Sequence, residues 1–107
     1  MASHHHGLTP EQVEIIRDIL RPFGSHIERV CLFGSRATGT YRNNSDIDIV
    51  LDGDVNEAML DRIWTLFDAS DLPVSVDVTA YKMVDYPPLK AHIDQVMVLL
   101  FSREEIQ

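Results

Sequence analysis

The amino-acid sequence predicts an α/β (α+β) fold in which a small mixed β-sheet of about four strands is flanked by helices. The chain has 107 residues, a length typical of one domain. Apolar residues make up 45% of it and charged residues 24%, as in ordinary globular proteins. The spacing of the apolar residues changes between the helical and the strand period and predicts the order α, β, β, α, β, α, β. A helix between the second and third strands favours a crossover connection between them.

The first half of the chain begins with a helix that carries its own start and stop signals. Thr9 and Gln12 have the spacing of a capping box, and Pro22 with Gly24 ends the helix near Leu20. Ile27–Phe33 is rich in apolar residues and is followed by a glycine, which predicts a strand. The glycines, asparagines and hydroxyl residues of 34–45 then predict a turn, a short helix and a loop.

A second strand and a second long helix follow. Ser45–Leu51 reads as a strand closed by a turn at Asp52-Gly53. Asp54 and Glu57 form a second capping pair, and the helix after them ends at Leu72-Pro73. Its apolar stripe includes Trp64, which we therefore expect in the core. The members of that stripe are Leu60, Ile63, Trp64 and Phe67.

The last third of the chain predicts two more strands and a helix. Val74–Thr79 alternates apolar and polar residues, as a half-buried strand does. Pro87 opens a helix to about Gln95, and the apolar run Val96–Phe101 predicts the final strand. We expect one domain over residues 9–101, a disordered segment or tag remnant over 1–8, and a polar tail over 102–107.

Composition excludes several classes of protein. The formal net charge of −8 disfavours binding to phosphate backbones, so no direct nucleic-acid binding is expected. The single cysteine, Cys31, excludes an internal disulfide framework and a cysteine-rich zinc site. No apolar run approaches the length of a membrane span, and no secretory signal is visible. We expect a cytoplasmic protein, and we exclude His4, His5 and His6 from fold reasoning.

Two aspartates of the second strand are the first candidate functional residues. Asp46 and Asp48 lie two positions apart, so on a strand both carboxylates point to one face, roughly 7 Å apart. At an effective dielectric constant of about 20, two such charges repel by roughly 2 kcal/mol. A hard divalent cation such as Mg²⁺ relieves that repulsion. Asp77 repeats the pattern on the third strand, where it could bind an ion or accept a proton from an attacking hydroxyl.

The turn after the first strand is the second candidate. Gly34 permits a close approach of the backbone, and Ser35 opens a short helix whose N–H groups favour phosphate. Arg36 either neutralises phosphate charge or forms a surface ion pair. Gly34 and Gly39 have P-loop spacing, but Thr40 follows where the P-loop lysine would stand, which excludes that motif. Tyr41 could stack on a base or simply be a half-buried loop aromatic.

These residues resemble the signature of a known superfamily. Gly34-Ser35, ten intervening residues and then Asp46-Ile47-Asp48 are similar to the motif of the polymerase β-like nucleotidyltransferases, and Asp77 matches their third carboxylate. The short chain resembles the minimal nucleotidyltransferases, the MNT antitoxins paired with HEPN toxins. The resemblance implies the polymerase β palm-like fold.

The resemblance also implies a role for each matching residue. Gly34, Ser35 and Arg36 would bind the triphosphate of ATP, and Asp46, Asp48 and Asp77 would be the catalytic, Mg²⁺-binding carboxylates. The implied reaction transfers AMP from ATP to a tyrosine of a partner HEPN toxin RNase. Only 28 residues follow Thr79, so we expect another chain to supply the acceptor surface. Two alternatives stay open: transfer to a small molecule such as an aminoglycoside, and a non-catalytic antitoxin that inhibits by binding.

Overall fold

The computed structural model describes residues 6–107 and has a four-stranded mixed sheet at its centre. The strand order is β3-β2-β1-β4; β2 and β3 run parallel, and the other neighbours are antiparallel. The strands are β1 (Ile27–Phe33), β2 (Ile47–Gly53), β3 (Val76–Ala80) and β4 (Val98–Ser102). This arrangement confirms the predicted fold class.

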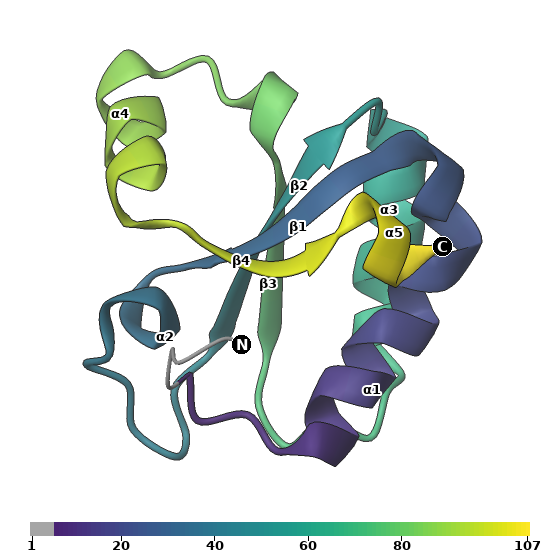
Figure 1. Cartoon of the computed structure of the whole chain (residues 1–107), viewed down its shortest axis with the longest axis vertical. Helices are drawn as coiled ribbons and strands as arrows, with labels where there is room; N and C mark the ends of the chain where they lie inside the picture. The colour runs from purple at the N-terminus through teal and green to yellow at the C-terminus, as the bar shows by residue number, and fades with distance from the viewer. Residues whose placement is uncertain (1–5) are drawn as a thin grey trace.

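The helices divide between the two faces of the sheet (Figure 1). One face is covered by α1 (Pro10–Leu20) and α3 (Glu57–Asp68), and the opposite face by α4 (Pro87–Val96). The remaining helices are short: η1 (Arg21–His26), α2 (Ser35–Thr38), η2 (Tyr81–Met83) and α5 (Arg103–Ile106). Because α3 connects the parallel strands β2 and β3, it is the crossover that the sequence predicts.

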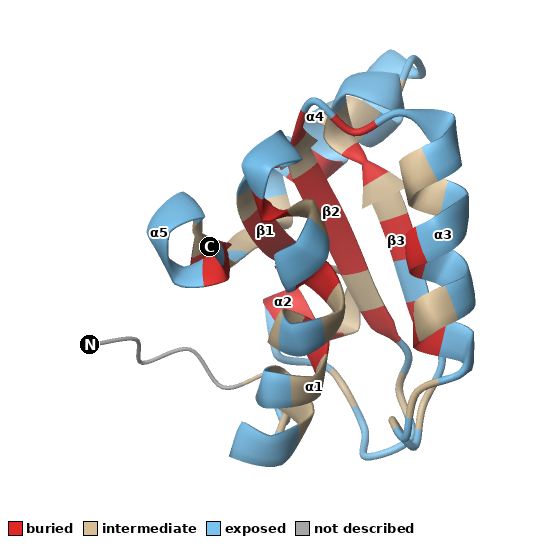
Figure 2. Cartoon of the chain, turned by 90° about the vertical axis from the view of Figure 1, so that its right-hand side faces the viewer, coloured by how far each residue is buried: buried red, intermediate tan, exposed pale blue. Residues whose placement is uncertain are grey.

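The alternation along β2 divides the buried residues into two clusters. Ile47, Ile49 and Leu51 belong to the larger cluster, under α1 and α3. Val50 points the other way and packs with Cys31 and with Ile93 of α4. Figure 2 shows β2 buried along most of its length, as expected for a central strand. The cluster that includes α4 is the smaller of the two, and the polar residues of β2 lie on the same face of the sheet.

The helix start that the sequence predicts is confirmed at α1 but is wrong at α3. The capping box of Thr9 and Gln12 is present at α1, with both reciprocal hydrogen bonds formed. At α3 the predicted capping pair is wrong: the N-cap is Asn56, whose side chain accepts a hydrogen bond from the Met59 N–H at 2.9 Å. The N–H of Asp54 instead donates to the carbonyl oxygen of His26.

Two further expectations need correction. The strand β2 does not end in a turn at Asp52-Gly53 but continues through Gly53, because Asp52 and Gly53 still pair with β1. The side chain of Asp52 also forms an ion pair with Arg29 of β1 at 2.9 Å. Trp64 is not a core residue; 38% of it is exposed, and its indole N–H donates to the carbonyl oxygen of Val78 at 3.1 Å. The ring therefore lies against the outer edge of β3, with its polar end satisfied by that edge.

The end of the chain differs from the expected polar tail. Arg103–Ile106 forms the short helix α5, whose capping box joins Ser102 and Glu105. Ile106 is completely buried in the larger cluster. At the other end, Leu8 packs on the same cluster, whereas residues 1–5, with His4 and His5, lie outside the described part of the chain. Within residues 6–107, no helix is long and apolar enough to cross a bilayer.

Candidate active site

The parallel pairing of β2 and β3 places two of the candidate carboxylates side by side. Asp48 and Asp77 are partners in the register of these strands. Neighbouring strands lie about 4.8 Å apart, and partners in register project from the same face. That face is the one opposite to Ile47 and Ile49, so both carboxylates lie on the side that α4 covers only in part.

Asp46 completes a group of three acidic side chains. It immediately precedes β2 and is exposed, whereas Asp48 is half-buried. Burial raises the pKa of Asp48 above its ordinary value, and the charges of Asp77 and Asp46 raise it further. Both neighbours are thus close enough for their charges to repel that of Asp48.

The turn after β1 lies directly against this group. Gly34 has a φ of +72°, a conformation that side-chain-bearing residues rarely adopt. A Cβ atom added to Gly34 would collide with the carboxylate of Asp48. The glycine therefore lets the backbone at the start of α2 approach Asp48. Ser35, the half-buried first residue of α2, follows Gly34 directly in the chain.

Arg36 is buried, with 3% of it exposed, so it does not lie at the surface as the expected surface ion pair would require. Its guanidinium donates to the carbonyl oxygens of His6, at 2.8 Å, and Ser45, at 2.9 Å. It also lies 5.2 Å from the centroid of the Tyr41 ring, so Tyr41 contacts an arginine within the loop.

The contact with the N-terminal segment was missed by sequence reasoning. His6 lies in the segment that we set aside as a tag remnant, and Gly7 is wedged between the Tyr41 ring and Arg36. A usable signal was present, since Gly7-Leu8 directly precedes the capping box at Thr9. An apolar residue before an N-cap often packs against the body of the protein.

The donor set suits a hard divalent cation. No cluster of three or more His, Cys, Asp or Glu side chains in residues 6–107 is arranged as a ready-made metal cage. However, carboxylate oxygens are the ligands that Mg²⁺ takes when a phosphate supplies the rest of its shell, and the pKa of the half-buried Asp48 is raised first by burial and then by the charges of Asp77 and Asp46. Asp46 and Asp48 therefore fit Mg²⁺ that arrives with a nucleotide.

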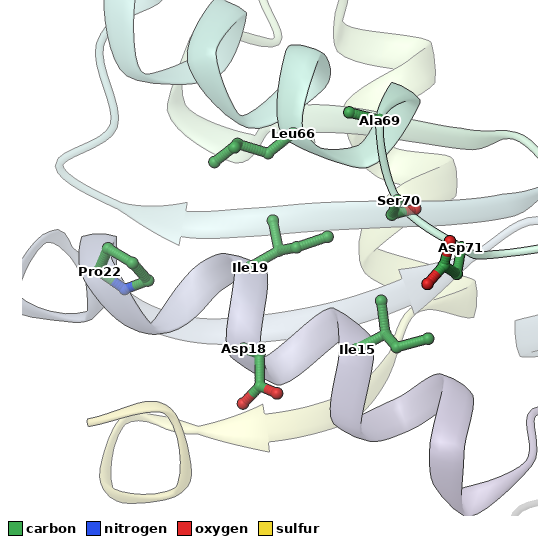
Figure 3. A pocket seen from close by; sticks show the side chains of 8 residues that line it. All are labelled: Ile15, Asp18, Ile19, Pro22, Leu66, Ala69, Ser70 and Asp71. Atoms are coloured by element: carbon green, nitrogen blue, oxygen red, sulfur yellow. The ribbon is translucent and has the colours of Figure 1, made fainter.

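A separate hollow lies away from the carboxylates. It has a volume of about 410 Å³ and is lined by Ile15, Asp18, Ile19, Pro22, Leu66, Ala69, Ser70 and Asp71 (Figure 3). Its walls are α1 and the end of α3, which cover the face of the sheet opposite to Asp48. The hollow is therefore not part of the carboxylate site.

Comparison with known families shows to which family the chain belongs. The polymerase β nucleotidyltransferase family matches residues 14–106. The chain belongs to this family. The match extends from within α1 to α5 and covers every candidate site residue, so the fold is that of a nucleotidyltransferase.

Solved structures agree with this assignment of the fold. A toxin–antitoxin structure with AMP-PNP has a TM-score of 0.67 and 24% identity over 88% of this chain and 79% of that one. The toxin–antitoxin MntA-HpeT, in a mutant with two aspartates two positions apart changed to glutamate, has a TM-score of 0.65 and 23% identity over the same shares. A nucleotidyltransferase candidate from Sulfolobus solfataricus has a TM-score of 0.51 and 26% identity over 89% of this chain and 84% of its own. No curated protein matches the chain.

Proposed function

We propose that the chain is a Mg²⁺-dependent antitoxin that transfers AMP from ATP to a tyrosine of a HEPN toxin. The observation that carries the proposal is the pairing of Asp48 with Asp77 beside Asp46, directly against the turn at Gly34. Such a face can hold a metal-bound triphosphate on one side and an attacking hydroxyl on the other. We propose that it operates in the cytoplasm, where ATP is available.

The similar structures support the choice of nucleotide and partner. One of them is a toxin–antitoxin with AMP-PNP, an analogue of ATP in which an imido group joins the β- and γ-phosphates. The substituted aspartates of the MntA-HpeT mutant have the spacing of Asp46 and Asp48. Together they favour an ATP-dependent antitoxin over transfer to a small molecule.

The proposed reaction assigns a task to each residue. Gly34 and Ser35 bind the triphosphate tail, and Asp46 and Asp48 hold Mg²⁺. When bound, Mg²⁺ neutralises charge on the phosphates and supplies Lewis-acid activation. Asp77 accepts the proton of the tyrosine hydroxyl, whose ordinary pKa is about 10, so that the oxygen can attack at neutral pH. The new bond joins that oxygen to the α-phosphorus; the bond to the β-phosphate oxygen breaks, and pyrophosphate leaves.

Intact-mass measurement of a mixture tests the proposal. The protein is incubated with a HEPN partner, ATP and Mg²⁺, and the mass of the partner should rise by one or more AMP units. The Asp77→Asn variant should leave that mass unchanged. A partner that is silenced without any change of mass would identify inhibition by contact, and label from ATP found only on an aminoglycoside would identify a small-molecule enzyme. Either result would overturn the proposal.

A further inference from the structure

Arg36 is the one charged side chain that the structure buries among residues 6–107. Burying a guanidinium is unfavourable unless its charge and N–H groups are satisfied. A buried arginine beside an active site therefore needs an explanation, and a general stabilising role is a poor one because replacing buried ionic groups by apolar ones is often neutral.

The partners of Arg36 connect separate segments of the site. One terminal nitrogen donates to the carbonyl oxygen of Ser45, the residue directly before Asp46. The other donates to the carbonyl oxygen of His6, and the guanidinium plane lies over the Tyr41 ring. Arg36 itself is the second residue of α2, next to Ser35. A single side chain thus joins the phosphate-side turn to the segment that carries Asp46.

Ser45 is held from a second direction. Its N–H donates to the carbonyl oxygen of Arg42, and its hydroxyl accepts from the N–H of Arg42 at 2.7 Å. These bonds close the loop on itself but do not connect it to α2. The Arg36 bond to Ser45 provides that connection, across nine positions of sequence.

We propose that Arg36 is a positioning residue that fixes Asp46 relative to the turn at Gly34-Ser35, and that it does not bind the nucleotide. The inference rests on the proposed function for its consequence in catalysis. The guanidinium donates to two backbone oxygens, lies over Tyr41 and belongs to a residue that is only 3% exposed, so a phosphate could reach it only if the surrounding loop opened. This arrangement explains why the residue is an arginine: the two terminal nitrogens of its planar guanidinium each donate to a different carbonyl oxygen, which the single ammonium group of lysine cannot do in this geometry.

The decisive variant is Arg36→Lys, which keeps the charge but loses the fork. Positioning predicts that kcat for AMP transfer falls at least tenfold while KM for ATP changes less than threefold. Arg62→Lys, an exposed arginine of α3, is the matched control and should change neither constant by more than twofold. A KM for ATP that rises tenfold or more at unchanged kcat would identify a phosphate contact and overturn the proposal.

Hydrogen exchange supplies a readout that does not depend on activity. In Arg36→Lys the amides of residues 40–46 should exchange at least tenfold faster, while those of β1 and β3 stay within twofold of the parent. Unchanged exchange in 40–46 would overturn the proposal whether or not AMP transfer is found. If AMP transfer is absent from the parent protein, the proposed function fails, and the exchange result still decides the structural role of Arg36.

A second variant protects the test against misfolding. Tyr41→Leu removes the ring beneath the guanidinium but leaves Arg36 and its two carbonyl bonds in place. It should accelerate exchange in residues 40–46 by a smaller factor than Arg36→Lys and reduce kcat in the same proportion. An unaltered loop in Tyr41→Leu, together with an unfolded Arg36→Lys, would show that Arg36 stabilises the fold as a whole and would also overturn the proposal.

Discussion

At the scale of single residues, the candidate site is organised around Asp48. The side chain has Asp77 beside it in the sheet, Asp46 two positions before it and the backbone of Gly34 in contact with its carboxylate. Burial and two like charges disfavour its ionised form. We therefore expect this arrangement to cost stability while all three carboxylates are ionised.

Removing the paired charges should therefore not weaken the metal-free fold. We expect the double variant Asp46→Asn, Asp48→Asn to unfold at the same temperature as the parent or a higher one in EDTA, because the repulsion is gone. AMP transfer should be lost. Thermal unfolding followed by circular dichroism checks the first expectation, and a clear fall in melting temperature would mean that the pair has a structural role.

Gly34 and Gly39 form a natural pair for testing the turn. Both have positive φ, +72° and +84°, but a Cβ on Gly34 meets Asp48 whereas one on Gly39 meets nothing within 4 Å. We expect Gly39→Ala to cost about 1 kcal/mol, the strain of a left-handed alanine. Gly34→Ala should cost more and displace the Asp48 carboxylate. Urea unfolding gives both values, and equal losses in the two variants would contradict the close approach at Gly34.

At the scale of elements, α5 shows how a short helix can matter for the whole domain. It has four residues, yet it carries a capping box and buries Ile106 completely beneath the sheet. We expect Ile106→Ala to lower the free energy of unfolding by about 2–4 kcal/mol, as for other buried isoleucines. Ser102→Ala should cost about 1 kcal/mol by removing the cap. Chemical denaturation measures both, and an Ile106→Ala value below that of Ser102→Ala would exclude a core role for α5.

The same capping box makes stability depend on pH in the acid range. The backbone N–H and the side chain of Ser102 hydrogen-bond to Glu105 and lower the pKa of its carboxyl below 4.5. Stability from this carboxylate is complete above that ordinary value and is lost as pH falls through the lower pKa of the folded state. We expect Glu105→Gln to lose less stability than the parent between pH 6 and pH 3. Parallel pH profiles of melting temperature would contradict this.

Elements with a strong local pattern were predictable, and those fixed by distant contacts were not. The helix between β2 and β3 predicted that these strands are neighbours, and the register confirms that Asp48 and Asp77 are partners, whereas Asp46 lies directly before β2. Helix α5 was missed because Ile106 is its one apolar residue, and a single residue cannot show the apolar spacing that predicts a helix. The Ser102–Glu105 pair was a readable start signal. The environment of Arg36 could not be read from sequence, because its two acceptors are backbone carbonyls.

At the scale of the whole molecule, the chain has a formal net charge of −8, and the carboxylates of Asp46 and Asp77 repel that of Asp48 within it. Any added salt screens the general repulsion between these charges and can stabilise the fold. A specific cation does more, because binding to the folded state alone raises the free energy of unfolding by mass action. The two effects must be separated before a rise in stability is taken as evidence for a metal site.

Thermal unfolding with matched salts makes that separation. Mg²⁺ together with ATP at ten times the dissociation constant should stabilise the protein by about 1.4 kcal/mol. For a domain of this size, that corresponds to a rise of roughly 5–10 °C in melting temperature. NaCl at the same ionic strength should give a smaller rise, and the Asp46→Asn, Asp48→Asn variant should respond equally to both salts because it retains only the general effect. Two results would show that the carboxylates do not hold the metal: the same rise in melting temperature in parent and variant, or a rise with ATP in EDTA as large as the rise with ATP and Mg²⁺. Either result would mean that the turn at Gly34 binds the nucleotide alone, because such binding needs neither aspartate.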